Sequence, residues 1–243
     1  MAKGVSRRRI LAAGLLGAVP ATGAAAAVIR GEAPWTGGAA APEPVAGGSG
    51  YVFFTEPEAA FVAAAAERLI PSDELGPGAV DAGALLFIDR QLAGEFGLGT
   101  RWYMQGPWPK GVPTQGYQTR LSPAAMYRAA IRAIDEAVGR TNGGKRFADL
   151  KADGQDAFLS SLEAGKADLG AVDGKAFFEV LLQNVVEGFW SDPIYGGNRD
   201  MAGWKLIGFP GARYDNAPYV SRHGERYPLP PVGLKGRPDW TRR

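Results

Sequence analysis

The abundance of glycine and proline constrains this chain more than any other feature. It contains 35 glycines and 18 prolines in 243 residues, and both residue types interrupt regular secondary structure. No segment alternates cleanly between apolar and polar residues, and no Asn-Gly turn lies between two candidate strands. The sequence therefore predicts an all-α fold: a single small helical domain of about five or six helices, joined by long loops rich in glycine, proline and aromatic residues.

Apolar periodicity and capping residues place the expected helices along the chain. Thr55 and Glu58 form a capping box before an alanine-rich pattern. Ser122, followed by proline, and Asp173 are the expected N-caps of two further helices. The expected helices are one after Thr55, one over roughly Val80 to Ala93, one from Ser122 to Gly139, short helices over about 147–164, and the most apolar helix after Asp173.

The composition divides the chain into four parts. Residues 1–27 form a signal segment, and residues 28–50 form a linker of mainly glycine, alanine and proline. Residues 51–215 carry the helical patterns, and residues 216–243 form a tail rich in proline and arginine. We expect this tail to be disordered, or to become ordered only against another surface.

The N-terminus resembles a twin-arginine export signal. Arg7 and Arg8 lie in the sequence SRRRIL, which precedes an apolar run and small residues that offer cleavage points near residues 24–27. An ordinary Sec signal and an uncleaved N-terminal anchor are the alternatives. Because the twin-arginine translocase carries folded cargo into the periplasm, we expect either rapid folding or transport together with a folded partner.

The composition excludes several kinds of site. The absence of cysteine rules out disulfides, cysteine-ligated zinc, iron–sulfur clusters and c-type haem attachment. The only histidine is His223, so a histidine-rich metal site is also excluded. Outside residues 1–27, 23 basic residues are balanced by 25 acidic residues. This balance does not favour nucleic-acid binding.

Three features approach known sites without meeting their requirements. Residues 139–146, GRTNGGKR, have the spacing of a P-loop, but Arg146 replaces the magnesium-binding Ser or Thr and a helix precedes the motif. The glycine pair within residues 76–83 lacks the third glycine and preceding strand of a dinucleotide site. His223 lies in the tail, where we expect a solvated side chain, a general base being the alternative.

Two loops rich in aromatic residues are the candidate functional regions. One lies near residues 102–117, and the other is GFWSDPIYGGNRDMAGWKLIGFPG, residues 188–211, which is too rich in glycine for a regular element. Exposed Trp, Tyr and Arg often anchor protein interfaces. Alternatively, these rings close a small helical core, or Asp192 and Asp200 bind calcium. The candidate partner-binding residues are Trp102, Trp108, Trp190, Asp192, Tyr195, Asn198, Arg199, Asp200, Trp204 and Phe209.

Three longer stretches carry a family resemblance. They begin FFTEPEAAFVAAAAERLIPSDELGPGAVDAG, QGYQTRLSPAAMYRAAIRAID and FFEVLLQNVVEGFWSDPIYGGNRDMAGWKLIGFPG. In this order they resemble the gluconate 2-dehydrogenase subunit 3 family over about residues 51–215. The tail after about residue 220 matches no motif of that family.

The resemblance implies that the chain is the small, or gamma, subunit of a membrane-bound dehydrogenase for sugars or sugar acids. The large subunit of such a complex is a GMC-type flavoprotein that holds FAD and oxidises the substrate. A multihaem cytochrome c subunit, where present, passes electrons to quinone. For this chain the resemblance implies no cofactor, metal or catalytic residue. It implies instead a role in assembly and in export of the folded flavoprotein.

Two other functions fit the sequence. The chain could be a free-standing periplasmic enzyme or sugar- or sugar-acid-binding protein whose tryptophans stack on sugar rings, or a lipid-surface protein that uses its basic tail. The accessory-subunit hypothesis predicts a partner at fixed stoichiometry and no flavin absorbance from the chain alone. It also predicts that Trp190→Ala or Trp204→Ala weakens complex formation more than it weakens the fold.

Overall fold

The computed structural model describes residues 50–109, 111–213 and 215–236. These residues all belong to one of the two compact units of the chain, and the other unit lies outside them. Within the described ranges there are seven α-helices and no strand, which confirms the all-α class. The helices are α2 (Glu56–Leu69), α3 (Ala84–Ala93), α4 (Glu95–Leu98), α5 (Pro123–Thr141), α6 (Ala152–Glu163), α7 (Gly174–Trp190) and α8 (Ala202–Ile207).

The helix starts follow from local capping chemistry. At α2 the backbone N–H of Thr55 donates to Glu58 Oε2 at 2.9 Å. At α5 the Ser122 hydroxyl accepts the N–H of Ala125 at 3.4 Å, and at α7 the Asp173 carboxylate accepts the N–H of Ala176 at 3.0 Å. These three predicted starts are confirmed.

Several elements differ from the sequence prediction: α4 was not among the expected helices, and α5 continues past its expected end at Gly139 to Thr141. Helix α3 begins at Ala84 rather than near Val80, because Gly83 before it has a left-handed backbone with φ of 83°. Next to Gly83, the carbonyl of Ala82 accepts the N–H of Arg199 at 2.7 Å. Residues 188–211 were expected to lack regular structure, yet they contain α8 and the 3-10 turns η3 (Pro193–Tyr195) and η4 (Arg199–Met201).

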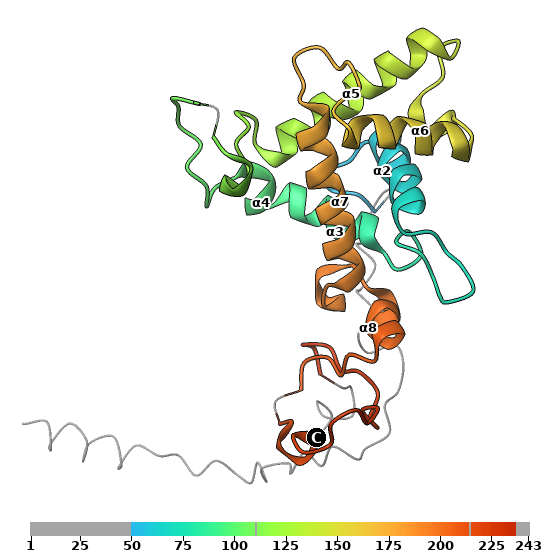
Figure 1. Cartoon of the computed structure of the whole chain (residues 1–243), viewed down its shortest axis with the longest axis vertical. Coiled ribbons are helices and arrows are strands. Elements are labelled where there is room, and N and C mark those ends of the chain that lie inside the picture. Colours follow the sequence, from blue (N-terminus) through green and yellow to red (C-terminus); the bar gives the residue numbers. More distant parts are fainter. Residues whose placement is uncertain (1–49, 110, 214, 237–243) are drawn as a thin grey trace, which may run out of the picture. The chain divides into compact units, whose positions relative to one another are not determined.

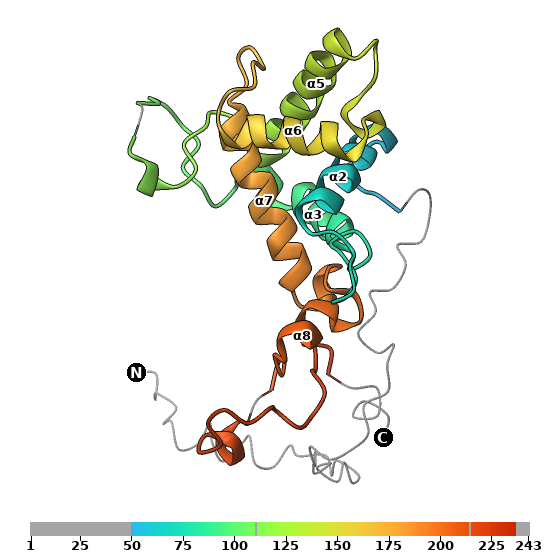
Figure 2. The ribbon, with the colours of Figure 1, turned by 45° about the vertical axis from the view of Figure 1, so that its right-hand side comes forward.

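Helix α7 is the central element of the domain. It contacts α2, α3, α5, α6 and α8, and its C-terminal end leads into the 188–211 loop (Figures 1 and 2). Buried aromatic rings fill the space between the helices. Ring centroids lie 4.9 Å apart for Phe61 and Phe147, and 5.3 Å apart for Tyr127 and Phe177. Such contacts make this packing the main source of the domain's stability.

No helix in the described ranges has both the length and the apolar character needed to span a bilayer.

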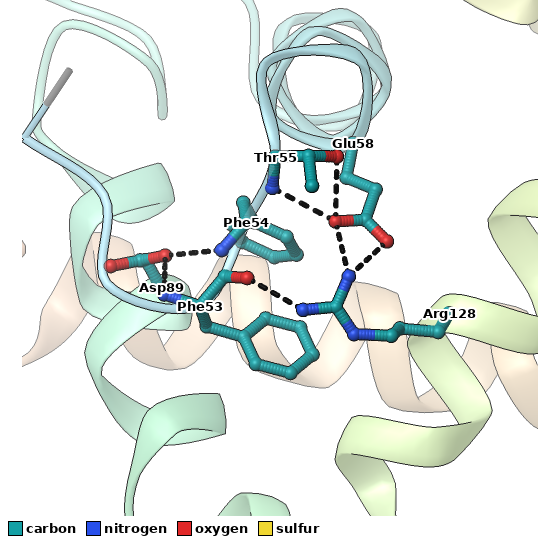
Figure 3. A network of polar contacts seen from close by, with 6 residues as sticks. All are labelled: Phe53, Phe54, Thr55, Glu58, Asp89 and Arg128. Carbon is teal, nitrogen blue, oxygen red and sulfur yellow. Dashed lines mark hydrogen bonds and ion pairs between the residues drawn. The ribbon is translucent and has the colours of Figure 1, made fainter.

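A buried carboxylate fixes the point where the chain enters the domain. Asp89 of α3 is fully buried and accepts the backbone N–H of Val52 at 2.7 Å. It also accepts the N–H groups of Phe53 and Phe54, both at 2.9 Å (Figure 3). A buried carboxylate needs such donors to offset its lost hydration. Asp89 therefore holds the segment just before α2 against α3.

An arginine on α5 holds the same entry segment from the other side. Arg128 Nη1 contacts both carboxylate oxygens of Glu58 at 2.6 and 2.7 Å, and Nη2 donates to the carbonyl of Phe53 at 2.8 Å (Figure 3). Its guanidinium also lies 4.4 Å from the centroid of the Phe53 ring. Helices α2, α3 and α5 are thus joined through the entry segment.

We expect Asp89→Asn to destabilise the domain by about 1–3 kcal/mol. Asparagine fills the same space, but its NH2 group would face backbone donors and leave at least one of them unpaired. The free energy of unfolding from urea titration measures the effect. Asp153→Asn, an exposed change on α6, is the matched control; equal stability of the two variants would contradict a structural role for Asp89.

Candidate partner interface

Asn198 organises the 188–211 loop. It is fully buried and has a left-handed backbone with φ of 45°. Its Nδ2 donates to the carbonyl of Ser191 at 2.9 Å, and its Oδ1 accepts the N–H of Gly203 at 2.9 Å. Its own N–H donates to the carbonyl of Gly188 at 3.0 Å. One side chain therefore joins the end of α7 to the start of α8.

Close backbone contact explains two of the glycines in this loop. A Cβ on Gly197 would lie 2.0 Å from the carbonyl oxygen of Gly188, and a Cβ on Gly203 would lie 2.7 Å from that of Phe189. No side chain fits at either distance, so both positions require glycine. The loop is packed directly onto the last turns of α7.

Trp204 belongs to the interior of the loop. Its ring is 6% exposed, and its Nε1–H donates to the carbonyl of Trp190 at 2.8 Å. Trp190 is half-buried and packs against Trp204 and the main core. Because the buried ring supports the loop, we now expect Trp204→Ala to lower the stability of the domain more than it weakens complex formation. Asn198 is likewise not available to a partner.

Asp192 ties the loop to the C-terminal segment. Its Oδ1 accepts the N–H of Ile194 at 3.0 Å, and its Oδ2 accepts the N–H of Leu234 at 2.7 Å. Beside it, the N–H of Ala212 donates to the carbonyl of Val232 at 2.7 Å. The described part of the predicted tail, residues 216–236, therefore returns to the loop.

The calcium alternative finds no support in this geometry. Both oxygens of Asp192 accept backbone hydrogen bonds, and Asp200 is exposed. In the part of the chain that the structure describes, no group of three or more His, Cys, Asp or Glu could hold a metal ion. Asp192 acts as a turn and tail anchor.

The outer surface of the loop is partly apolar. Of the predicted residues, Tyr195 is 49% and Phe209 is 44% exposed, and Arg199 and Asp200 are also exposed. Sequence reasoning missed three further exposed apolar residues, which we group with Phe209 as the α8 patch. The α8 patch comprises Leu75, Leu206, Ile207 and Phe209, with exposures of 72%, 48%, 63% and 44%.

A shallow cavity connects two members of the α8 patch. Leu75 and Leu206 both line it, together with Phe189, and its volume is about 380 Å³. Asp200 and Lys205 contribute polar atoms to its edge. The patch therefore combines a hollow with exposed aliphatic side chains, an arrangement that suits docking of another protein.

The two aromatic loops meet at a second cavity. Trp102 and Tyr195 both line a hollow of about 550 Å³, together with Arg90 and Arg101. Trp108 does not line this cavity and is half-buried in its own loop. The structure thus brings together one predicted residue from each loop.

Comparison with known proteins identifies the family. The model of the gluconate 2-dehydrogenase subunit 3 family matches residues 56–211. The chain belongs to this family. Neither a curated protein nor a solved structure matches it. As a gluconate 2-dehydrogenase subunit 3 protein, the chain is a subunit of a dehydrogenase complex and has partner subunits.

The family match includes the loop and excludes the tail. It begins at the first residue of α2 and ends at Gly211, which forms a bridge with Val232 of the C-terminal segment. The subunit 3 domain therefore contains α2 to α8 and every residue of the α8 patch. The run KLIGF contains Leu206, Ile207 and Phe209, but nothing in this sequence pattern distinguishes exposed from buried apolar residues.

We expect Asn198→Ala to destabilise the domain by about 2–4 kcal/mol, because it removes two side-chain hydrogen bonds and places alanine in a left-handed conformation. Thermal or urea unfolding measures the loss. Asn198→Gly is the matched control, since it removes the same bonds but accepts the backbone angle, and it should be about 1 kcal/mol less harmful. An alanine variant as stable as the glycine variant would show that the backbone conformation is not strained.

Proposed function

We propose that this chain is the non-catalytic small subunit of a periplasm-facing, FAD-dependent dehydrogenase complex. It binds a GMC-type flavoprotein through the α8 patch. The observation that carries the proposal is the contrast within one loop: Asn198 and Trp204 are buried and hydrogen-bonded, while Leu206, Ile207 and Phe209 are exposed beside them. Family membership supports a subunit role.

The physical argument is one of preorganisation. Exposed apolar groups gain free energy when a partner removes them from water. The gain is largest when the segment that bears them is already ordered, because no loop entropy is then lost on binding. The hydrogen bonds of Asn198 and the close contact at Gly197 provide that order before any partner arrives.

The redox groups of the proposed complex lie in its other subunits. FAD is held by the flavoprotein, and haem c by a membrane-bound multihaem cytochrome c subunit in complexes that have one. The chain itself has no cysteine, and its single histidine, His223, is exposed in the described tail. Substrate choice would then reside in the large subunit.

Export is the second part of the proposed function. Arg7 and Arg8 lie outside the described residues, so this part rests on their sequence pattern. We propose that the twin-arginine translocase recognises this signal and carries the flavoprotein with the small subunit as one folded complex. The complex would then lie in the periplasm, associated with the cytoplasmic membrane.

We expect Ile207→Asp to weaken binding of the flavoprotein by at least about tenfold, because the charge must be desolvated in an apolar contact. The fold should be unaffected, since the side chain is 63% exposed. Co-purification from the native cell envelope, with flavin absorbance as the readout, measures binding. Leu98→Asp is the matched control, because Leu98 is 66% exposed on α4, away from the patch. Unchanged recovery of flavoprotein with Ile207→Asp would exclude the α8 patch as the interface.

We expect the double change Arg7→Lys and Arg8→Lys to retain both this chain and its flavoprotein in the cytoplasm. Lysine keeps the positive charge of arginine, so the double change alters only the recognition of the arginine pair by the translocase. Cell fractionation with immunodetection of both chains measures the distribution. Normal periplasmic flavoprotein in this double variant would disprove co-export while leaving subunit binding untouched.

A further inference from the structure

A separate cleft lies between α7 and the first aromatic loop. Its volume is about 410 Å³, within the range of small-molecule sites. It shares no residue with the α8 patch. Its lining consists of Phe96, Trp102, Gln115, Tyr117, Val180, Gln183 and Asn184.

Three aromatic rings form a continuous wall of this cleft. The ring centroid of Trp102 lies 5.7 Å from that of Phe96, nearly perpendicular to it, and 4.8 Å from that of Tyr117. Trp102 is 39% exposed, so part of the indole remains open to a ligand. Tyr117 is fixed by its own hydrogen bond to the carbonyl of Leu121 at 2.7 Å. The wall is thus an ordered stacking surface.

A largely buried amide of α7 also lines the cleft and uses only one end in a hydrogen bond. Asn184 of α7 is 3% exposed, and its Nδ2 donates to the hydroxyl of Tyr127 at 3.0 Å. Burial raises the pKa of Tyr127, which keeps this hydroxyl neutral. The other end of the Asn184 amide has no hydrogen bond within the described residues, in whichever orientation the amide is placed. That end is not sealed from solvent, because among the described residues Arg213 Nε is the one buried side-chain nitrogen or oxygen without a partner.

Two further side-chain amides in the lining each have one group without a hydrogen-bond partner, an acceptor in one case and a donor in the other. Gln183 donates through Nε2 to Glu187 at 2.7 Å, and its carbonyl oxygen has no partner in the described chain. Gln115 accepts the N–H of Val112 through Oε1 at 2.7 Å, and its NH2 group has none there. The cleft therefore offers both acceptors and a donor beside its aromatic wall, and none of its lining residues carries a charge.

We propose that this cleft binds a neutral cyclic polyol of pyranose size. The C–H face of such a ring stacks on Trp102, and its hydroxyl groups donate to the open carbonyl groups and accept from Gln115. A sugar acid should bind more weakly, because its carboxylate would lose hydration in a cleft whose lining has no cation. An open-chain polyol should also bind more weakly, because it loses more conformational entropy on binding than a ring does. The site is independent of the flavoprotein interface.

Titration of the purified full-length chain with D-glucose and myo-inositol tests the proposal, with saturation-transfer NMR as the readout. Both compounds should bind saturably, whereas gluconate, an open-chain anion, and sorbitol, an open-chain neutral polyol, should bind at least about tenfold more weakly. Absence of saturable binding of both cyclic probes would overturn the proposal. Equal binding of all four compounds would also overturn it, because the cleft would then select neither ring nor charge.

Variants locate the binding within the molecule. Trp102→Ala and Gln183→Ala change exposed or partly exposed positions and should each weaken glucose binding by about tenfold. Trp108→Ala is the matched control, because Trp108 lies in the same loop without lining the cleft. Glucose binding that survives Trp102→Ala would place the site elsewhere and refute the assignment. Ile207→Asp should leave glucose binding intact. The proposed flavoprotein interface and the proposed polyol site can therefore be tested independently of each other.

Discussion

The two hydrogen bonds of the Asn198 side chain support the most distinctive part of this protein. Around it, Asn198, Asp200 and Met201 all have positive φ values, which L-residues other than glycine adopt at a cost. Such a backbone persists when the surrounding contacts fix it. Here the amide of Asn198 joins the carbonyl of Ser191 to the N–H of Gly203, and α8 starts from that point. The position of every exposed α8 side chain depends on this bridge.

A single loop combines two roles that the sequence does not separate. Tryptophan, asparagine and phenylalanine within residues 188–211 look equivalent when read along the chain. In the structure Trp204 and Asn198 form a small interior, and Phe209 lies on the surface next to them, with its ring centroid 5.2 Å from that of Trp204. Loops that carry function are often built in this way, with a fixed base and an exposed rim. The partner-binding role assigned to the exposed residues remains a prediction.

Local chemistry explains which features could be predicted. The starts of α2, α5 and α7 depend on side chains within three residues of the helix, so the sequence contains the whole signal. The left-handed Gly83 before α3 lies next to the contact of Ala82 with Arg199, which is more than a hundred residues away and leaves no local pattern. The same holds for the contact of Asp192 with Leu234 and for the burial of Trp204. Long-range contacts therefore account for most of the differences.

The hydrogen bonds of Asp89 to the entry segment affect which residues of that segment can vary in evolution. Its three bonds go to main-chain N–H groups of residues 52–54, which every amino acid except proline supplies. The attachment therefore imposes little selection on the side chain of Val52, which is 64% exposed. The two residues that follow are constrained by their side chains instead, because the ring of Phe53 packs against Arg128 and Phe54 is buried in the core.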